Sequence, residues 1–330
     1  FREKAVRPFG PRGGKRTRMS KRPQKIVVIG GGTGSYNVLL GLKKYDARLT
    51  AVVSMMDSGG STGRLRDEFG FLPPGDVRRC LAALSRDTGL LRSLFEYRFN
   101  RGSGLNGHSF GNLFLTVLRD ITGSDADAIK EAGKILSVCG HVLPVTIANC
   151  QLGAILENGQ VVVGETNISV PKHDTNLRIK KLFSIPPVRV FKEAERSILE
   201  ADKIVIGPGD LYTSILSNVI VGGVKPAILK SPARKIYVCN IMTKKGETAG
   251  FKAADFIREL EKYLGKGIVH KIVCNNTVPA GPLLKKYAAE GASFVAPDAG
   301  DRRVVKADLL GGKDLARHDP DKLARVLINL

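Results

Sequence analysis

The chain lacks the features that mark membrane, secreted and metal-dependent proteins. Gly, Pro or a charged residue interrupts every apolar run before it reaches the length of a membrane-spanning helix. The first residues carry no apolar core of a signal peptide. The five cysteines are scattered without a C-x-x-C pair, and the five histidines are equally dispersed. We therefore expect a cytoplasmic protein with reduced cysteines, no transmembrane segment and no metal centre.

Acidic residues are also scarce, with 31 against 52 lysines and arginines, and the formal net charge is +21. Residues 1–25 alone carry a net charge of +9, which leaves +12 for the rest. Because it is rich in Gly, Pro and charge, the segment 1–24 is predicted to be a disordered basic tail. Such a tail is either solvated or contacts RNA or anionic membrane non-specifically. No RNA-binding signature accompanies the remaining excess, so specific nucleic-acid binding is not expected.

Apolar strand patterns alternate with helical patterns from residue 25 onward, and the chain is 43% hydrophobic. This alternation predicts one α/β domain over residues 25–330, with a Rossmann-like, doubly wound and mostly parallel sheet. Within it we expect a helical region at about 77–136 and a helix near 253–264. A β-rich excursion is expected at about 140–192, where Asn158-Gly159 joins two strand patterns as a hairpin turn. Ser124 and Asp319 are the predicted N-caps of two further helices.

Three apolar strand patterns, at 25–29, 49–54 and 203–206, each lead into a glycine-rich turn. Neither a G-x-G-x-x-G fingerprint nor a Walker A loop is present. Because parallel strands end at one edge of the sheet, the three turns should converge on one crevice. The predicted ligand-binding residues are Gly31, Gly32, Thr33 and Gly34 in the first turn, Asp57, Ser58, Gly59, Gly60, Ser61 and Arg64 in the second, and Gly207, Pro208, Gly209, Asp210, Thr213 and Ser214 in the third.

The second turn, Met56–Arg66, is the most informative segment and is predicted to be irregular. Its glycines offer bare N–H groups to ligand oxygens, Asp57 can accept from hydroxyls, and arginine suits phosphate. This combination indicates a site for a phosphorylated, sugar-like ligand. The alternatives are a flexible linker and an Arg64 or Arg66 that pairs with Glu68.

The third turn and two further segments can also be interpreted as having purely structural roles. Asp210, Thr213 and Ser214 would also serve as caps of the helix that follows them. Asp76, after Pro73-Pro74-Gly75, is predicted to be the N-cap of a helix that starts at Val77. His108, Ser109 and Asn112 open another helix and are predicted to face the crevice, whereas a lone histidine there is often only a satisfied structural residue.

The motifs together resemble the YvcK family of gluconeogenesis-factor proteins, a branch of the CofD-like group that includes 2-phospho-L-lactate transferase. The resemblance runs from Lys25 almost to the end of the chain and excludes residues 1–24. The blocks that carry it are the three glycine turns, Pro73-Pro74-Gly75-Asp76, Gly107-His108-Ser109-Phe110-Gly111-Asn112-Leu113, Val238-Cys239-Asn240-Ile241-Met242-Thr243 and Gly246-Glu247-Thr248.

The resemblance implies a cytoplasmic protein that binds UDP-sugars, notably UDP-N-acetylglucosamine and UDP-glucose, and influences carbon metabolism, cell shape and the cell wall. It adds Asn240 to the expected ligand-binding residues. A regulator of this kind needs no cofactor. The alternative is a transferase acting on a nucleotide-diphosphate-activated substrate, with Asp57 or Asp76 as base or Mg²⁺ anchor. We further expect a homo-oligomer, a dimer, and protein partners that the sequence does not identify.

Overall fold

The computed structural model describes residues 22–71, 75–86, 89–297, 300–312 and 314–330. Of the predicted basic tail, only residues 22–24 fall within these ranges. Pro73 and Pro74, which precede the predicted cap Asp76, also lie outside the described residues. Within the described ranges, no helix is both long enough and apolar enough to cross a bilayer.

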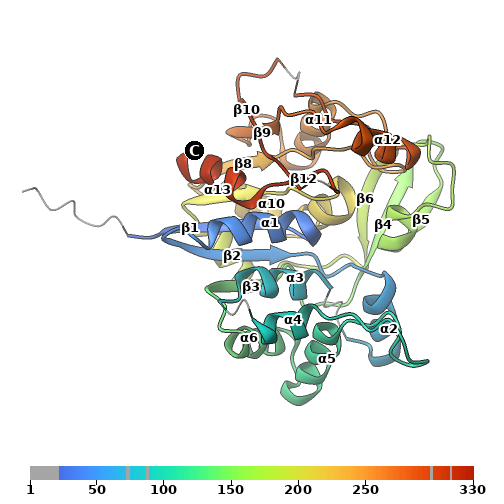
Figure 1. Cartoon of the computed structure of the whole chain (residues 1–330), viewed down its shortest axis with the longest axis vertical. Coiled ribbons are helices and arrows are strands. Elements are labelled where there is room, and N and C mark those ends of the chain that lie inside the picture. The colour runs from blue at the N-terminus through green and yellow to red at the C-terminus, as the bar shows by residue number, and fades with distance from the viewer. Residues whose placement is uncertain (1–21, 72–74, 87–88, 298–299, 313) are drawn as a thin grey trace, which may run out of the picture.

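A seven-stranded sheet runs through the centre of the molecule (Figure 1), in the order β10-β9-β8-β7-β1-β2-β3. Every neighbouring pair in it is parallel. This confirms the Rossmann-like, doubly wound parallel sheet. The strands are β1 (Gln24–Gly30), β2 (Ala47–Val53), β3 (Gly140–Pro144), β7 (Lys203–Ile206), β8 (Arg234–Val238), β9 (Lys271–Asn275) and β10 (Val304–Ala307).

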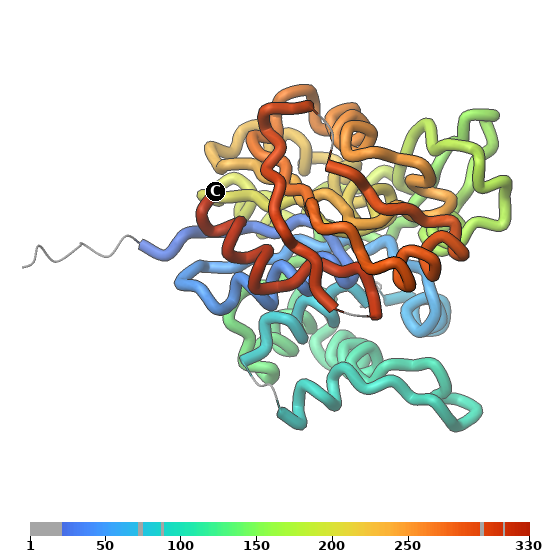
Figure 2. The backbone as a smooth tube through the Cα atoms, turned by 45° about the horizontal axis from the view of Figure 1, so that its top comes forward, coloured from blue at the N-terminus to red at the C-terminus, as the bar shows by residue number. Residues whose placement is uncertain are grey.

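Side chains of the central strands alternate between two hydrophobic cores, one on each face of the sheet. Ile26 and Val28 belong to the core covered by α1 (Gly32–Leu42), α3 (Gly75–Leu84), α4 (Leu90–Glu96), α5 (Phe110–Thr122), α6 (Asp125–Ile135) and α13 (Pro320–Asn329). Val27 and Ile29 belong to the core covered by α8 (Lys192–Leu199), the π-helical turn η1 (Leu211–Leu216), α9 (Ser217–Val219), α10 (Val224–Lys230) and α11 (Ala253–Leu264). In the tube view, the red C-terminal segment passes close to the blue N-terminal one (Figure 2).

A separate three-stranded antiparallel sheet stands at one end of the main sheet (Figure 1), in the order β5-β4-β6. It consists of β4 (Gln151–Leu156), β5 (Val161–Val163) and β6 (Ile179–Ile185), and α7 (Glu165–Ser169) follows β5. The predicted hairpin is therefore present. The predicted excursion began too early, however, because residues 140–144 form β3 at the edge of the main sheet. Gly140 permits this pairing, since a Cβ there would lie 2.6 Å from the Leu49 carbonyl oxygen.

The prediction that Met56–Arg66 is irregular is wrong from Gly60 onward, because α2 spans Gly60–Phe69. Gly60 starts this helix at φ +49°, and Gly63 lies inside it, where a Cβ would sit 2.3 Å from the Ser58 carbonyl oxygen. The glycines thus serve close backbone packing as well as loop geometry. The predicted N-caps Ser124 and Asp319 are confirmed, each accepting backbone N–H bonds. The remaining elements are α12 (Gly281–Ala289), β11 (Leu310–Gly311) and β12 (Arg317–His318).

Candidate functional site

The three glycine turns meet at the carboxyl edge of β7, β1 and β2, which are neighbours in the sheet. Gly32 of the first turn, Asp57 of the second and Asp210 of the third border one small pocket of about 190 Å³. A larger cavity of about 640 Å³ lies next to it and shares Asp210 as a wall residue. The three turns therefore converge as predicted, and they border two adjoining cavities.

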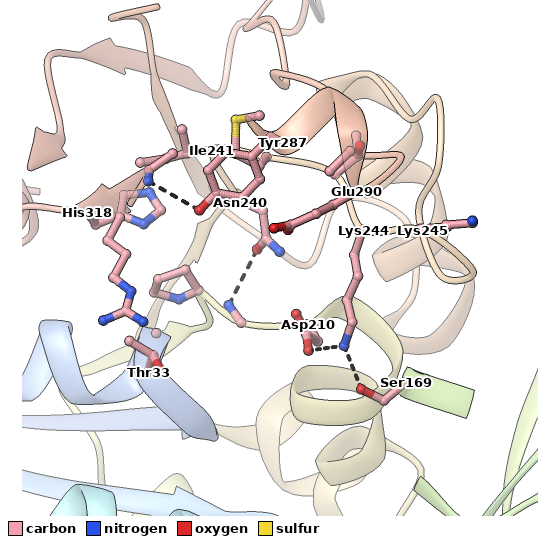
Figure 3. A pocket seen from close by; sticks show the side chains of 18 of the residues that line it. Thr33, Ser169, Asp210, Asn240, Ile241, Lys244, Lys245, Tyr287, Glu290 and His318 are labelled. Atoms are coloured by element: carbon pink, nitrogen blue, oxygen red, sulfur yellow. Dashed lines mark hydrogen bonds and ion pairs between the residues drawn. The ribbon is translucent and has the colours of Figure 1, made fainter. Parts of the chain in front are cut away.

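The larger cavity is bordered by Thr33 and Gly34 on α1, by the third turn, and by the segment that follows β8. Figure 3 shows its side chains, with Tyr287 and His318 on the wall opposite Asp210. Gly34 has to be glycine for packing, since a Cβ would lie 2.0 Å from the Pro208 carbonyl oxygen. Asn240 closes the third turn by accepting, through Oδ1, a 3.4 Å bond from Gly209 N. Arg317 also borders this cavity, and its side chain has no ion pair among the described residues.

Lys244 connects three side chains at the rim of this cavity through hydrogen bonds and ion pairs. Its Nζ donates to Asp210 Oδ2 at 2.5 Å, to Glu247 Oε1 at 2.9 Å and to Ser169 Oγ at 2.6 Å. Burial by itself lowers the pKa of Lys244, but the charges of Glu247 and Asp210 outweigh it and leave that pKa above its ordinary value. Asp210 was predicted to cap η1 through its side chain. Its backbone carbonyl accepts from Ser214 N, whereas its carboxylate makes no cap bond and is held by Lys244 instead.

Four carboxylates border the smaller pocket: Asp57, Asp76, Glu165 and Asp210. Arg79 is the cation among its wall residues, and its Nη1 donates to Thr33 Oγ1 at 2.8 Å. Burial, followed by the charge of Asp57, raises the pKa of Glu165 to about 7 and the pKa of Asp76 to about 6. In the part of the chain that the structure describes, no three His, Cys, Asp or Glu side chains are arranged to hold a metal ion.

Asp76 is not the N-cap of the helix that it was predicted to start. It lies inside the first turn of α3, which begins at Gly75. Its Oδ1 instead accepts a 2.8 Å bond from Gly32 N at the start of α1. A side chain at Gly31 would have no room, because a Cβ there would lie 2.0 Å from Asp76 Oδ2. Asp76 therefore accepts the N–H of the first residue of α1 and links α1 to α3.

Several predicted site residues border neither cavity and instead support α2. Asn112 is buried; its Nδ2 donates to Ser61 Oγ and Thr62 Oγ1, and its Oδ1 accepts from Arg78 Nε. His108 Nδ1 lies 3.1 Å from Ser61 Oγ, and Ser109 caps α5. Burial lowers the pKa of His108, with a further contribution from Arg64. The predicted residues outside both cavities are Gly31, Ser58, Gly59, Gly60, Ser61, Arg64, His108, Ser109, Asn112 and Gly207.

Comparison with known proteins agrees with this architecture. Residues 26–311 match the family described as 2-phospho-L-lactate transferase CofD. The gluconeogenesis factor of Bacillus subtilis is 41% identical over 319 residues, which cover 94% of this chain and 99% of that protein. A relative from Thermotoga maritima is 44% identical over 313 residues, with 92% and 98% of the two chains covered. This chain belongs to the CofD family, among the gluconeogenesis factors.

A protein of the UPF0052 family from Bacillus halodurans has a solved structure that is similar to this one. This CofD-family chain matches it with a TM-score of 0.88 at 39% identity, over 94% of this chain and 100% of the other. The fold described above is therefore also found in a related protein of known structure.

Sequence reasoning missed several wall residues of this CofD-family site. Lys244 and Lys245 follow β8, so the rule that ligands bind at strand ends would have found them. Arg79 lies three residues after Asp76 on α3, on the same face of that helix. Glu165 and Arg317 carry no local signal, because α7 and β12 reach the site only through the tertiary fold.

Proposed function

We propose that this protein binds a nucleotide sugar, UDP-N-acetylglucosamine or UDP-glucose, as a regulatory ligand. The observation that carries the proposal is the cavity of about 640 Å³ at the carboxyl ends of the strands, bordered by two glycine turns. Ligand pockets of roughly 300–1,000 Å³ take small molecules and cofactors, and open α/β sheets bind them at this edge.

The wall of the cavity matches the parts of such a ligand. Thr33, Gly34 and Gly209 bring the backbone of two glycine turns to the wall of this space, which suits a diphosphate. Arg317 supplies a guanidinium without a carboxylate partner among the described residues, and guanidinium groups pair well with phosphate oxygens. Ile241, Met242 and Tyr287 supply an apolar section for a nucleobase.

A regulatory role fits the state of the site's charged groups. Lys244 is already bound to two carboxylates, and Asp76 is bound to Gly32, so both serve as structural ties. The names of the relatives connect the family with gluconeogenesis. We therefore propose that the ligand acts as a signal in carbon metabolism. We extend the proposal to the cell wall and to cell shape, because UDP-sugars are used to build the wall and the wall determines the shape.

A transferase activity is the alternative, and one observation favours it. Asp76 lies beside the glycine turn with its pKa raised to about 6 by burial and by Asp57, which suits a general base near neutral pH. The matched family is also described by a transferase name. Under this alternative Mg²⁺ would accompany the diphosphate, and Asp57 or Asp76 would assist transfer.

Calorimetric titration with UDP-N-acetylglucosamine, UDP-glucose, UDP and ADP tests the proposal. We expect saturable binding of the UDP-sugars and a higher melting temperature, since ligand at 100 times Kd adds about 2.7 kcal/mol of stability. Arg317→Met should weaken binding by about 10-fold, which corresponds to about 1.4 kcal/mol. Arg325→Met, an exposed arginine on α13 outside both cavities, is the control.

Chromatography of the same mixtures with Mg²⁺ separates regulator from transferase. We expect UDP-N-acetylglucosamine to remain intact over hours. Steady release of UDP or UMP that disappears in Asp76→Asn would favour the transferase. Absence of heat and of any thermal shift with every nucleotide sugar would refute the binding proposal.

A further inference from the structure

The smaller pocket lies beside the larger cavity at the first glycine turn. Gly32 borders the smaller pocket, Thr33 and Gly34 border the larger cavity, and Asp210 borders both. A diphosphate that lies along this turn would therefore have one end in each space. The pocket of about 190 Å³ corresponds to about six water molecules at about 30 Å³ each, which is room for one ring with its substituents.

The walls of this pocket offer acceptors for hydrogen bonds. Asp57 Oδ1 accepts from Gly59 N, Asp76 Oδ1 from Gly32 N, and Asp210 Oδ2 from Lys244 Nζ. Glu165 Oε2 receives a long 3.4 Å bond from Thr166 Oγ1. In each case the second carboxylate oxygen has no hydrogen bond within the described ranges. An ionised carboxylate only accepts, so the pocket suits a group rich in O–H or N–H donors.

Ser54 adds an observation that does not depend on the carboxylates. It borders the pocket and is only 3% exposed. Its Oγ accepts a 3.4 Å bond from Met56 N, and its own proton has no acceptor among the described residues. The proton of this hydroxyl can therefore be donated to a ligand oxygen in the pocket. The pocket thus offers both acceptors and a donor to a polyhydroxylated ring.

We propose that the smaller pocket holds the sugar ring of the bound nucleotide sugar, and that its carboxylates select neutral sugars over sugar acids. This inference rests on the proposed nucleotide-sugar binding. A neutral sugar presents hydroxyl donors to the free carboxylate oxygens. A sugar acid brings another carboxylate, which donates nothing when ionised and is repelled by Asp57, Asp76, Glu165 and Asp210, with Arg79 as the opposing cation.

UDP-glucose and UDP-glucuronate provide a matched test, because they differ only at C6, where a CH₂OH group is replaced by a carboxylate. Titration of the full chain at pH 8 with UDP-glucose, UDP-glucuronate and UDP should give the tightest binding with UDP-glucose. We expect UDP-glucuronate to bind at least 10-fold more weakly. In Glu165→Gln the ratio of the two affinities should fall by about 3-fold or more, because one repelling charge is gone.

Glu157→Gln is the control for this variant. It removes the same charge from an exposed residue that pairs loosely with Arg178 and lies outside both cavities, so the ratio should stay as in the parent. Equal affinities for UDP-glucose and UDP-glucuronate, or for UDP-glucose and UDP, would overturn the sugar pocket while leaving nucleotide binding intact. If none of the three ligands binds, the proposed function itself fails and the inference falls with it.

Discussion

The two adjoining cavities share a glycine turn and a wall residue but differ in charge. Three cations and two carboxylates border the larger cavity: Lys244, Lys245, Arg317, Asp210 and Glu290. Four carboxylates and one cation border the smaller pocket: Asp57, Asp76, Glu165, Asp210 and Arg79. The parallel sheet places both spaces at the same edge. The sign of the charge in each space depends also on residues from other elements, such as Glu165 on α7 and Arg317 on β12. The first glycine turn thus borders two spaces of opposite charge.

The largest effect should come from the cation that joins the two environments. Lys244→Met leaves the Glu247 carboxylate, whose side chain is 0% exposed, without its cation. We expect a loss of about 3–5 kcal/mol of unfolding free energy, measured by urea denaturation. Lys245→Met is the matched control, because this neighbour has no ion pair among the described residues and should change stability by less than about 0.5 kcal/mol. Equal losses of unfolding free energy in the two variants would contradict the role of Lys244 as the cation that compensates the buried Glu247 carboxylate.

The charge crowding of the smaller pocket predicts a stabilising substitution. The pKa of Glu165 is raised from 4.5 to about 7 by burial and by Asp57, so the ionised form is disfavoured in the folded state. Its contribution to stability is fully present below pH 4.5 and is lost as the pH rises through 7. Glu165→Gln should therefore raise unfolding free energy by about 1–3 kcal/mol at pH 8 and change little at pH 4.

Thermal denaturation between pH 4 and pH 8 measures this difference, with Glu157→Gln as the exposed control. The groups that act on Glu165 are Asp57, Lys244, Glu247 and Asp76. A gain that is as large at pH 4 as at pH 8 would exclude ionisation of Glu165 as its cause.

Two glycines in the left-handed region allow an effect of backbone strain to be distinguished from a loss of ligand contact. Gly32 has φ +62° and Gly60 has φ +49°, so alanine at either position should cost about 1–2 kcal/mol of stability. Gly32 borders the smaller pocket, where a Cβ would approach Ser214 and Arg79 at 3.9 Å, whereas a Cβ at Gly60 meets nothing within 4 Å. Gly32→Ala should therefore weaken UDP-sugar binding by about 10-fold, and Gly60→Ala should leave it unchanged. A matching loss of affinity in Gly60→Ala would bring the second turn back into the binding site.

The smallest effect is expected at Arg64, which was predicted to bind phosphate. Its Nη2 donates to the Asn106 carbonyl oxygen at 2.9 Å, and it borders neither cavity. Arg64→Met should change stability by less than about 0.5 kcal/mol and leave calorimetric affinity for UDP-sugars unchanged. A clear loss of affinity would show that α2 moves toward the ligand.

The sequence predicts most of the fold because the strong signals are local. The strand at 203–206 and the helix at 253–264 have the predicted bounds, since apolar periodicity and strand length decide both. The start of α2 and the membership of β3 could not be predicted in this way. Glycines at positions 60 and 63 resemble a loop until Ser58 is packed against them, and β3 joins β2 across more than eighty residues of chain.

The candidate site divides in the same manner. Gly32, Asp57 and Asp210 follow strands directly, so the strand-end rule places them together, and the structure confirms that they border one pocket. Asp76 was placed in the right neighbourhood but given the wrong partner, because an N-cap is a local rule and its bond to Gly32 is a tertiary one. Glu165 and Arg317 depend on long-range packing that no local pattern encodes.

The close approach of α1 and α13 has a consequence for the order of folding. A Cβ at Gly41 would lie 2.0 Å from the Pro320 carbonyl oxygen, so the first and last helices touch through their backbones. Leu323 and Leu327 complete the core that contains Leu39 and Leu42. During synthesis, the first βα unit with its glycine turn must wait for α13 before that core closes. We expect such long-range closure to slow folding and to leave apolar surface exposed in early intermediates.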